Sequence, residues 1–365
     1  MRVRFSPDIF RVERFGGVAR YIAELHRELL VAGIDSRILA GLHRNAYLTH
    51  ADRALGLSIE GVRPVRLRQA MSKVADRSLE RLWAPAQDRG TIYHKTYFDR
   101  HVPTGPTLAV TVYDMIHERY PDQVSPRDVT PAAKRPWCER ADVVFAISAH
   151  TRDDLVERFD LDPDRVVVTP LGVRVTAPDP SVVVAGGRPF VLYVGARGPR
   201  YKNFEGLARA YARSAARRVT SLVCFGGGPG TPAELELLAG LGLADTEFAS
   251  GADGVLAAHY AQARAFIYPS HYEGFGLPPL EAMSHGCPVA AARVASIPDV
   301  VGEAAVLFDP ADHDAMAGAI DLVVGDDGRR AQLIDAGRER VVDFSWAETA
   351  QRTIAGYERA LAAPR

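Results

Sequence analysis

The chain has 365 residues, of which 47% are hydrophobic and 24% charged, and its formal net charge is −1. These values are typical of a globular protein with two domains of ordinary size. A charge so near zero gives no overall attraction to nucleic acid, and no apolar run approaches the roughly 20 residues of a membrane span.

The three cysteines, Cys138, Cys224 and Cys287, lie far apart and lack the spacing of a metal site. Cys224 falls within an apolar run, so buried and reduced thiols are the simplest interpretation. The N-terminus lacks the pattern of a signal peptide. We therefore expect a cytoplasmic protein.

The first half of the chain alternates short apolar strands with amphipathic helices, the pattern of a doubly wound α/β domain. Strands are predicted at residues 1–5, 36–39, 91–94, 107–113, 143–147 and 165–170. Apolar residues recur at helical spacing from Val18 to Leu29, and Ser148 and Thr151 are predicted to cap a helix that ends at Phe159.

A glycine pair, Gly16 and Gly17, separates the first predicted strand from the first helix. A helix N-terminus in this place can face a phosphate or an acceptor. A tight turn without a ligand fits the two glycines equally well.

Polar residues follow two of the predicted strands. His94 ends one strand, and Asp114 and His117 follow the next. Ligands of doubly wound sheets sit beyond the carboxyl ends of the strands, so we expect these three side chains at a site. The competing interpretation is that each one caps a helix or bonds within a loop.

The stretch from Arg63 to Trp83 is basic and helix-like, with apolar residues interspersed. Such a stretch usually forms a solvated helix face, but a basic amphipathic helix can also lie on anionic lipid. Both interpretations remain open.

A proline- and glycine-rich stretch at residues 173–188 is predicted to be an interdomain linker. We place the domains at residues 1–175 and 176–345, followed by a C-terminal helix at 346–365. In the second half, strands are predicted at 190–194, 221–225 and 265–268, and helices at 204–216, 312–324 and 329–342. Arg197 and Lys202 follow the first of these strands, where the residues themselves fit a solvated basic turn.

The most informative stretch covers residues 265–289, where a buried strand is followed by a glycine-rich turn and a helix predicted at 280–284. The turn consists of Gly274, Phe275, Gly276 and Leu277. Such a turn aims backbone N–H groups and the positive end of a helix at one point, which suits a phosphate.

Two carboxylates, Glu273 and Glu281, bracket this turn. Acids beside a phosphate site make sense if the ligand also carries hydroxyls, because a carboxylate can accept two hydrogen bonds from a diol. The competing interpretation is a strand–turn–helix corner with two surface glutamates.

The whole string resembles the signature of glycosyltransferase family 4, whose members are retaining enzymes of the GT-B fold and carry two glutamates separated by seven residues. The matching residues are Pro269, Ser270, Glu273 to Pro278, Glu281 to Met283, Gly286, Pro288 and Val289. A weaker similarity extends over almost all of the chain. The family commonly has His-Asp where this chain has Tyr113-Asp114, which puts the role of that imidazole in doubt, although His117 or His94 can supply one.

The resemblance implies an α/β GT-B fold, in which two doubly wound, Rossmann-like domains face a cleft and the C-terminal helix crosses back to the N-terminal domain. It implies that the N-terminal domain binds the acceptor and the C-terminal domain the nucleotide sugar. The expected activity is that of a retaining hexosyltransferase that moves a sugar from a nucleotide diphosphate sugar to an acceptor hydroxyl, in cell-surface polysaccharide or glycoconjugate biosynthesis.

The resemblance also assigns roles to the candidate residues. Glu281 would hold the ribose, Glu273 the transferred sugar, and Asp114 or His117 the sugar or acceptor. The remaining donor-binding candidates are Gly16, Gly17, Arg197, Lys202, Gly274, Phe275, Gly276 and Leu277.

We expect no cofactor and no metal, since basic groups and backbone N–H groups can neutralise the diphosphate. The expected partners are a nucleotide-sugar donor and a glycan or lipid-linked acceptor, with no nucleic acid. The stretch from Arg63 to Trp83 can provide peripheral contact with the inner membrane face. The alternatives are a nucleotide-sugar epimerase on the same fold and a non-catalytic nucleotide-sugar-binding partner.

Overall fold

The computed structural model describes residues 1–14, 16–43, 45–48, 52, 54–58, 90–99, 101–103, 105–184, 186 and 188–363. The basic stretch from Arg63 to Trp83 lies outside the described residues. The chain divides into two compact units, the first comprising Met1–Gly172 and Trp346–Arg365 and the second Val173–Ser345. Each unit has a parallel sheet and a core of its own.

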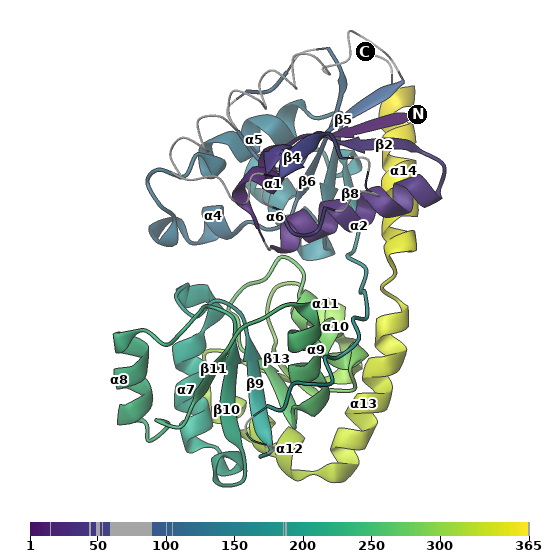
Figure 1. The fold of residues 1–365 in the computed structure, drawn as a ribbon. Helices are drawn as coiled ribbons and strands as arrows, with labels where there is room; N and C mark the ends of the chain where they lie inside the picture. The colour runs from purple at the N-terminus through teal and green to yellow at the C-terminus, as the bar shows by residue number, and fades with distance from the viewer. Residues whose placement is uncertain are drawn as a thin grey trace. The chain divides into compact units, whose positions relative to one another are not determined.

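The first unit is built on a six-stranded parallel sheet (Figure 1). Its strands, in spatial order, are β2 (Asp35–Ile38), β1 (Arg2–Phe5), β5 (Thr91–Lys95), β6 (Thr107–Val112), β7 (Val143–Ala146) and β8 (Val166–Val168). A separate pair consists of β3 (Gly41–His43) and β4 (Gly56–Ser58). The direction of winding reverses between β1 and β5, so their carboxyl ends mark the switch point of this sheet.

The second unit repeats this plan. Its sheet has the order β11 (Glu247–Ala249), β10 (Ser221–Phe225), β9 (Phe190–Val194), β12 (Ala265–Tyr268), β13 (Val289–Ala292) and β14 (Ala305–Phe308). The winding reverses between β9 and β12. The four strands from β10 to β13 in this order are almost wholly buried, which explains why they are continuous apolar runs rather than alternating ones.

Helices cover the sheets of both units (Figure 1). In the described part of the first unit, they are α1 (Asp8–Val12), α2 (Gly17–Val31), α4 (Ile116–Arg119), α5 (Thr130–Arg140), α6 (Ala149–Phe159) and α14 (Trp346–Ala362). Those of the second are α7 (Phe204–Arg213), α8 (Pro232–Gly240), α9 (Asp253–Gln262), α10 (Leu277–Ser284), α11 (Ile297–Val301), α12 (His313–Gly325) and α13 (Asp327–Val342). Ser148 caps α6 as predicted, since its Oγ accepts from the N–H of Thr151 at 3.0 Å.

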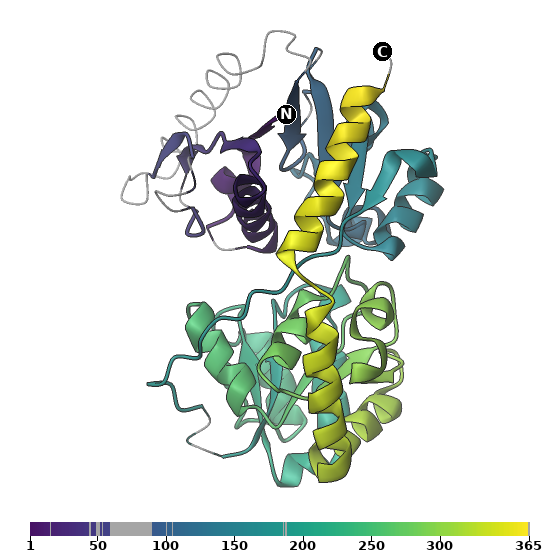
Figure 2. The same ribbon diagram turned by 90° about the vertical axis from the view of Figure 1, so that its right-hand side faces the viewer.

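The C-terminal helix α14 packs on the first unit, as predicted, beside α2 and strands β6 to β8 (Figure 2). His94 faces this helix from within β5. Its Nδ1 lies 2.5 Å from Tyr357 Oη and its Nε2 lies 2.9 Å from Thr111 Oγ1. The side chain is fully buried, and this burial lowers the pKa of His94 to about 3. The prediction that His94 lies beyond the strand end as a site residue is therefore wrong.

Close packing of α14 requires a glycine at position 356. A Cβ there would lie 2.5 Å from Cε1 and 2.9 Å from Cζ of the buried Phe145 ring. We expect Gly356→Ala to cost about 1–3 kcal/mol of stability through overpacking. Gly318→Ala in α12 is the control, because no described atom lies within 4 Å of its Cβ and the substitution should gain up to about 1 kcal/mol.

Urea unfolding followed by circular dichroism measures both variants. A midpoint for Gly356→Ala that equals or exceeds that of Gly318→Ala would show that α14 does not dock as described.

Candidate functional site

The predicted strand–turn–helix of residues 265–289 is present in the second unit. β12 is buried along its length, and α10 begins at Leu277 rather than at the predicted residue 280. Pro278 and Pro279 occupy its first turn, where a missing N–H costs little. Gly276 precedes the helix with a φ of 111°, a conformation that residues with a side chain rarely adopt.

The predicted carboxylate Glu273 and the predicted cation Lys202 lie in direct contact beside this turn. Lys202 Nζ is 2.8 Å from Oε1 and 3.1 Å from Oε2 of Glu273. The exposed fractions of the two side chains are 22% and 10%. The two groups thus compensate each other's charge in a mostly buried place, where charge–charge attraction is stronger than in water.

The loop that carries Lys202 is tied to the loop that carries Glu273. Asn203 follows Lys202 in the left-handed conformation, with φ of 54°, and its Nδ2 donates to the carbonyls of Pro269 and Pro310, both at 3.0 Å. The N–H of His271 donates to the carbonyl of Tyr201 at 2.7 Å. These contacts hold the ion pair in place from both sides.

Two further residues of this region were not identified from the sequence. Burial, together with the nearby carboxylate of Glu273, raises the pKa of Tyr268 well above its usual value, so its hydroxyl stays protonated. The Oγ of Ser296 lies 2.9 Å from the carbonyl oxygen of Glu273 and 2.7 Å from that of Phe275. No local pattern marks either residue, because Ser296 bonds to carbonyls far from it in sequence and the burial of Tyr268 depends on the fold around it.

Glu281 lies on α10, half-buried, beside a tyrosine of α9. Tyr260 Oη points to Glu281 Oε2 at 3.5 Å, the long limit of a hydrogen bond. The ring of Tyr260 stacks on that of His285, with centroids 6.0 Å apart. Glu281 therefore lies beyond the turn from Glu273, as predicted, and its contact with ribose stays a prediction.

Arg197 makes several contacts within the protein, although its predicted role is to bind the diphosphate. Its guanidinium donates to the carbonyls of Gly226, Gly228 and Pro229 at 2.5, 2.8 and 3.0 Å, and its Nε donates to Glu234 at 3.1 Å. It also lies 4.6 Å from the ring centroid of Phe248. These contacts hold the glycine-rich loop after β10, and contact with a diphosphate stays a prediction.

In the first unit, Gly16 and Gly17 lie at the start of α2, as expected. The nearest anion is the carboxylate of Glu13, whose Oε2 accepts from the N–H of Ala19 at 2.9 Å. A Cβ on Gly16 would clash with this carboxylate. Burial raises the pKa of Glu13. The helix N-terminus thus already has a carboxylate against it, and donor contact by the two glycines stays a prediction.

Asp114 and His117 lie beyond β6 but have separate partners. Asp114 Oδ1 accepts from the N–H of Ile116 at 3.0 Å, which is the local bond of the competing interpretation. His117 Nε2 lies 3.3 Å from Asp128 Oδ2 and is mostly buried. No described contact joins Asp114 to His117, and their roles toward sugar or acceptor stay predictions.

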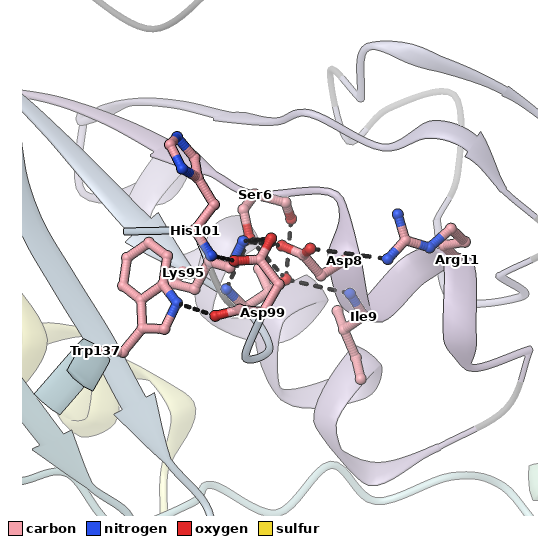
Figure 3. Close-up of polar contacts among 9 residues, drawn as sticks. Ser6, Asp8, Ile9, Arg11, Lys95, Asp99, His101 and Trp137 are labelled. Atoms are coloured by element: carbon pink, nitrogen blue, oxygen red, sulfur yellow. Dashed lines mark hydrogen bonds and ion pairs between the residues drawn. The ribbon is translucent and has the colours of Figure 1, made fainter. Parts of the chain in front are cut away.

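A buried charged cluster lies at the carboxyl ends of β1 and β5, the switch point of the first sheet (Figure 3). Lys95 Nζ is 2.8 Å from Asp8 Oδ2 and 2.9 Å from Asp99 Oδ2, and it lies 5.0 Å from the ring centroid of Trp137. Ser6 Oγ donates to Asp8 Oδ2 at 2.6 Å. The lysine is 1% exposed, whereas the Asp99 side chain is 36% exposed and forms the accessible edge of the cluster.

All three cysteines are free and buried, as predicted, and burial raises the pKa of Cys138 and Cys224 to about 12. Among the residues that the structure describes, no three His, Cys, Asp or Glu side chains gather as metal ligands. Within the same ranges, every helix is too short or too polar to span a bilayer.

Family models match both halves of the chain. The model described as Glycosyltransferase Family 4 matches residues 15–177, and that described as Glycosyl transferases group 1 matches residues 179–340. The chain is also 31% identical over 293 residues to O-antigen chain mannosyltransferase B of Escherichia coli, covering 76% of each chain. The chain belongs to glycosyltransferase family 4. It is therefore an enzyme that transfers sugars from a nucleotide-sugar donor.

Solved structures show the same architecture. Sucrose-phosphate synthase from Thermosynechococcus elongatus matches with a TM-score of 0.75 and 22% identity, covering 100% of this chain and 99% of that chain. Anabaena HepE, solved in complex with UDP and glucose, matches with a TM-score of 0.72 and 15% identity over 98% of this chain and 99% of that chain. The predicted GT-B fold is confirmed.

Substitutions of Lys202 and of Glu273 should change the affinity for a nucleoside diphosphate in opposite directions. Glu273→Gln releases the ammonium of Lys202 from its carboxylate, so we expect affinity for a bare nucleoside diphosphate to rise by about tenfold, or about 1.4 kcal/mol. Lys202→Met removes the cation and should lower that affinity by a similar factor. Calorimetry with UDP and GDP measures both changes.

Glu205→Gln is the matched control, because Glu205 pairs with Arg209 on the exposed face of α7 in the same unit. An exposed pair of this kind contributes little, so nucleotide affinity should not change. Equal affinities for Glu273→Gln and Lys202→Met would mean that the pair does not face the diphosphate.

Proposed function

We propose that this enzyme transfers a mannosyl residue from its nucleotide diphosphate donor to a hydroxyl of a cell-surface polysaccharide or related glycoconjugate, with retention at the anomeric carbon and without a metal. The choice of mannose is supported by relatives named O-antigen chain mannosyltransferase B, MMP alpha-(1->4)-mannosyltransferase and serotype-specific mannosyltransferase WbdA. The observation that carries the proposal is the Lys202–Glu273 pair beside the glycine turn that opens α10.

The pair and the turn together match the two halves of such a donor. The N–H groups of residues 274–277, the positive end of α10 and the ammonium of Lys202 suit a diphosphate. The carboxylate of Glu273 suits the hydroxyls of the sugar that the diphosphate carries. A nucleotide sugar carries both groups. Its diphosphate can replace Glu273 as the partner of Lys202, and its sugar hydroxyls can replace Lys202 as the partner of Glu273.

Departure of the diphosphate builds negative charge on its oxygens and positive charge on the sugar ring. Lys202 and the backbone N–H groups stabilise the former, and Glu273 stabilises the latter. In a front-face reaction, the acceptor oxygen forms its bond to the anomeric carbon on the side from which the diphosphate leaves. The acceptor proton passes to an oxygen of the departing phosphate, so no protein nucleophile is required.

The acceptor is proposed to bind the first unit at the carboxyl ends of its strands, where Asp114, His117 and the exposed edge of the Asp8–Lys95–Asp99 cluster lie. We propose a cytoplasmic enzyme acting on a glycan or lipid-linked acceptor at the inner membrane face. The basic stretch from Arg63 to Trp83 supports the membrane contact by its charge alone.

The donor is identified by thermal-shift measurements with GDP-mannose and with UDP-, dTDP- and ADP-sugars, because a ligand that binds only the folded state stabilises it. Proton NMR of the product then reports the anomeric configuration. We expect the largest shift with a mannose donor and an α-linked product from an α-linked donor. A β-linked product contradicts retention, and a free epimerised sugar without transfer contradicts a transferase.

The proposed independence from metal is tested by transfer assays after exhaustive chelation. Since Lys202 and the turn N–H groups are proposed to neutralise the diphosphate, the rate should fall by less than about twofold. Complete loss of transfer that a divalent metal restores would reject this part of the proposal.

The two glutamates should differ in their kinetics. Ribose is bound alike in the substrate and the transition state, so Glu281→Gln should raise KM more than it lowers kcat. Glu273→Gln should lower kcat by on the order of 10²-fold, because it removes charge that the transition state needs. Steady-state kinetics with the identified donor measure both, and the reverse pattern would exchange the two roles.

A further inference from the structure

Ser296 contacts the glycine turn from outside the segment that carries the family signature. It lies between β13 and α11, and α11 packs against α10 in the second unit (Figure 1). The residue is fully buried. Its Oγ lies 2.9 Å from the carbonyl oxygen of Glu273 and 2.7 Å from that of Phe275. A hydroxyl has one proton, so the two carbonyls share it as acceptors.

These two contacts determine which way the turn presents its amides. A trans peptide unit points its C=O and its N–H in opposite directions. The carbonyls of Glu273 and Phe275 both point to Ser296, so the N–H groups of Gly274 and Gly276 both point away from it, toward the same side. Amides on one side of a turn that opens a helix can donate to an anion there.

The backbone next to Ser296 is strained. Ala295 has a φ of 51°, and the other non-glycine residues with positive φ in the described part of the chain are Asp160 and Asn203. Asp and Asn tolerate this region through local side-chain hydrogen bonds, whereas alanine has no such means. Strain of this kind persists where the surrounding structure requires it, and it gathers at functional sites.

We propose that Ser296 is a positioning residue for the donor diphosphate, and that the left-handed conformation of Ala295 presents its hydroxyl to the carbonyls of Glu273 and Phe275. The hydroxyl does not touch the donor. It aims the amides of Gly274 and Gly276 at the phosphates and holds the backbone of Glu273. This inference rests on the proposed function, because it assigns the diphosphate to that turn.

The test compares a nucleoside diphosphate with its nucleoside, using calorimetry with GDP and guanosine, or UDP and uridine. For Ser296→Ala we expect about tenfold weaker binding of the diphosphate and unchanged binding of the nucleoside. We also expect kcat to fall together with the diphosphate affinity, since Glu273 loses its backbone anchor. A purely structural role would lower thermal stability without changing the ratio of the two affinities.

Ser214→Ala is the matched control. Ser214 is a buried serine of the same unit, and its Oγ donates to Asp321 at 2.5 Å, remote in sequence from the turn. The Ser214→Ala variant should have lower thermal stability, and its ratio of diphosphate affinity to nucleoside affinity should equal that of the wild type. If Ser296→Ala does not fold, Ser296→Cys keeps a side chain of the same shape, slightly larger and with a weaker donor, and it should bind the diphosphate at least about threefold more weakly.

Wild-type diphosphate affinity in a folded Ser296→Ala or Ser296→Cys protein would overturn this inference and leave the proposed function intact. A wild-type protein that binds no nucleoside diphosphate at all would overturn both. A diphosphate-to-nucleoside ratio that changes equally in Ser214→Ala would also overturn the inference, because the effect would then follow from stability alone.

Discussion

The turn between β12 and α10 is held by contacts from two separate segments of the second unit, the loop that carries Tyr201 and Asn203 and the loop that carries Ser296. Asn203 binds the carbonyl at the end of β12, Tyr201 accepts from the N–H of His271, and Ser296 contacts two carbonyls within the turn. Gly276 permits the backbone conformation but does not enforce it, since glycine populates many others. The position of Glu273 therefore depends on the packing of the whole carboxyl edge of the sheet, and not on the glycine turn alone.

The charged groups of the candidate sites already have partners within the protein, and these partners differ in how readily a ligand can replace them. Arg197 donates to backbone carbonyls, which would stay buried and unpaired if it moved to a phosphate. Lys202 pairs with a carboxylate that can accept hydrogen bonds from sugar hydroxyls instead. Lys202 is thus the cation whose partner a nucleotide sugar can replace without leaving a polar group unpaired.

The features predicted from the sequence are those that local chemistry determines. The apolar runs marked the strands, and the glycines and prolines of residues 274–279 marked the turn and the start of α10. His94 was misplaced because its partner Tyr357 lies on a helix far along the chain, and strand ends cannot be located to one residue from an apolar run. Ser296 and the Asp8–Lys95–Asp99 cluster were not predicted for a similar reason, because their interactions join segments that are distant in sequence.

The strain at Ala295 and the geometry of the glycine turn are coupled. The left-handed conformation costs about 1–2 kcal/mol for a residue with a Cβ. Asn203 offsets its own cost with two hydrogen bonds from its side chain, but Ala295 has none to make. Compensation must come from its neighbours, namely the bond from the N–H of Ile297 to the carbonyl of Val294 at 3.1 Å and the buried hydroxyl of Ser296. The hydrogen bonds of Ser296 to the carbonyls of Glu273 and Phe275 therefore stabilise the loop after β13 and also orient the turn after β12. The conformations of this loop and this turn cannot change independently.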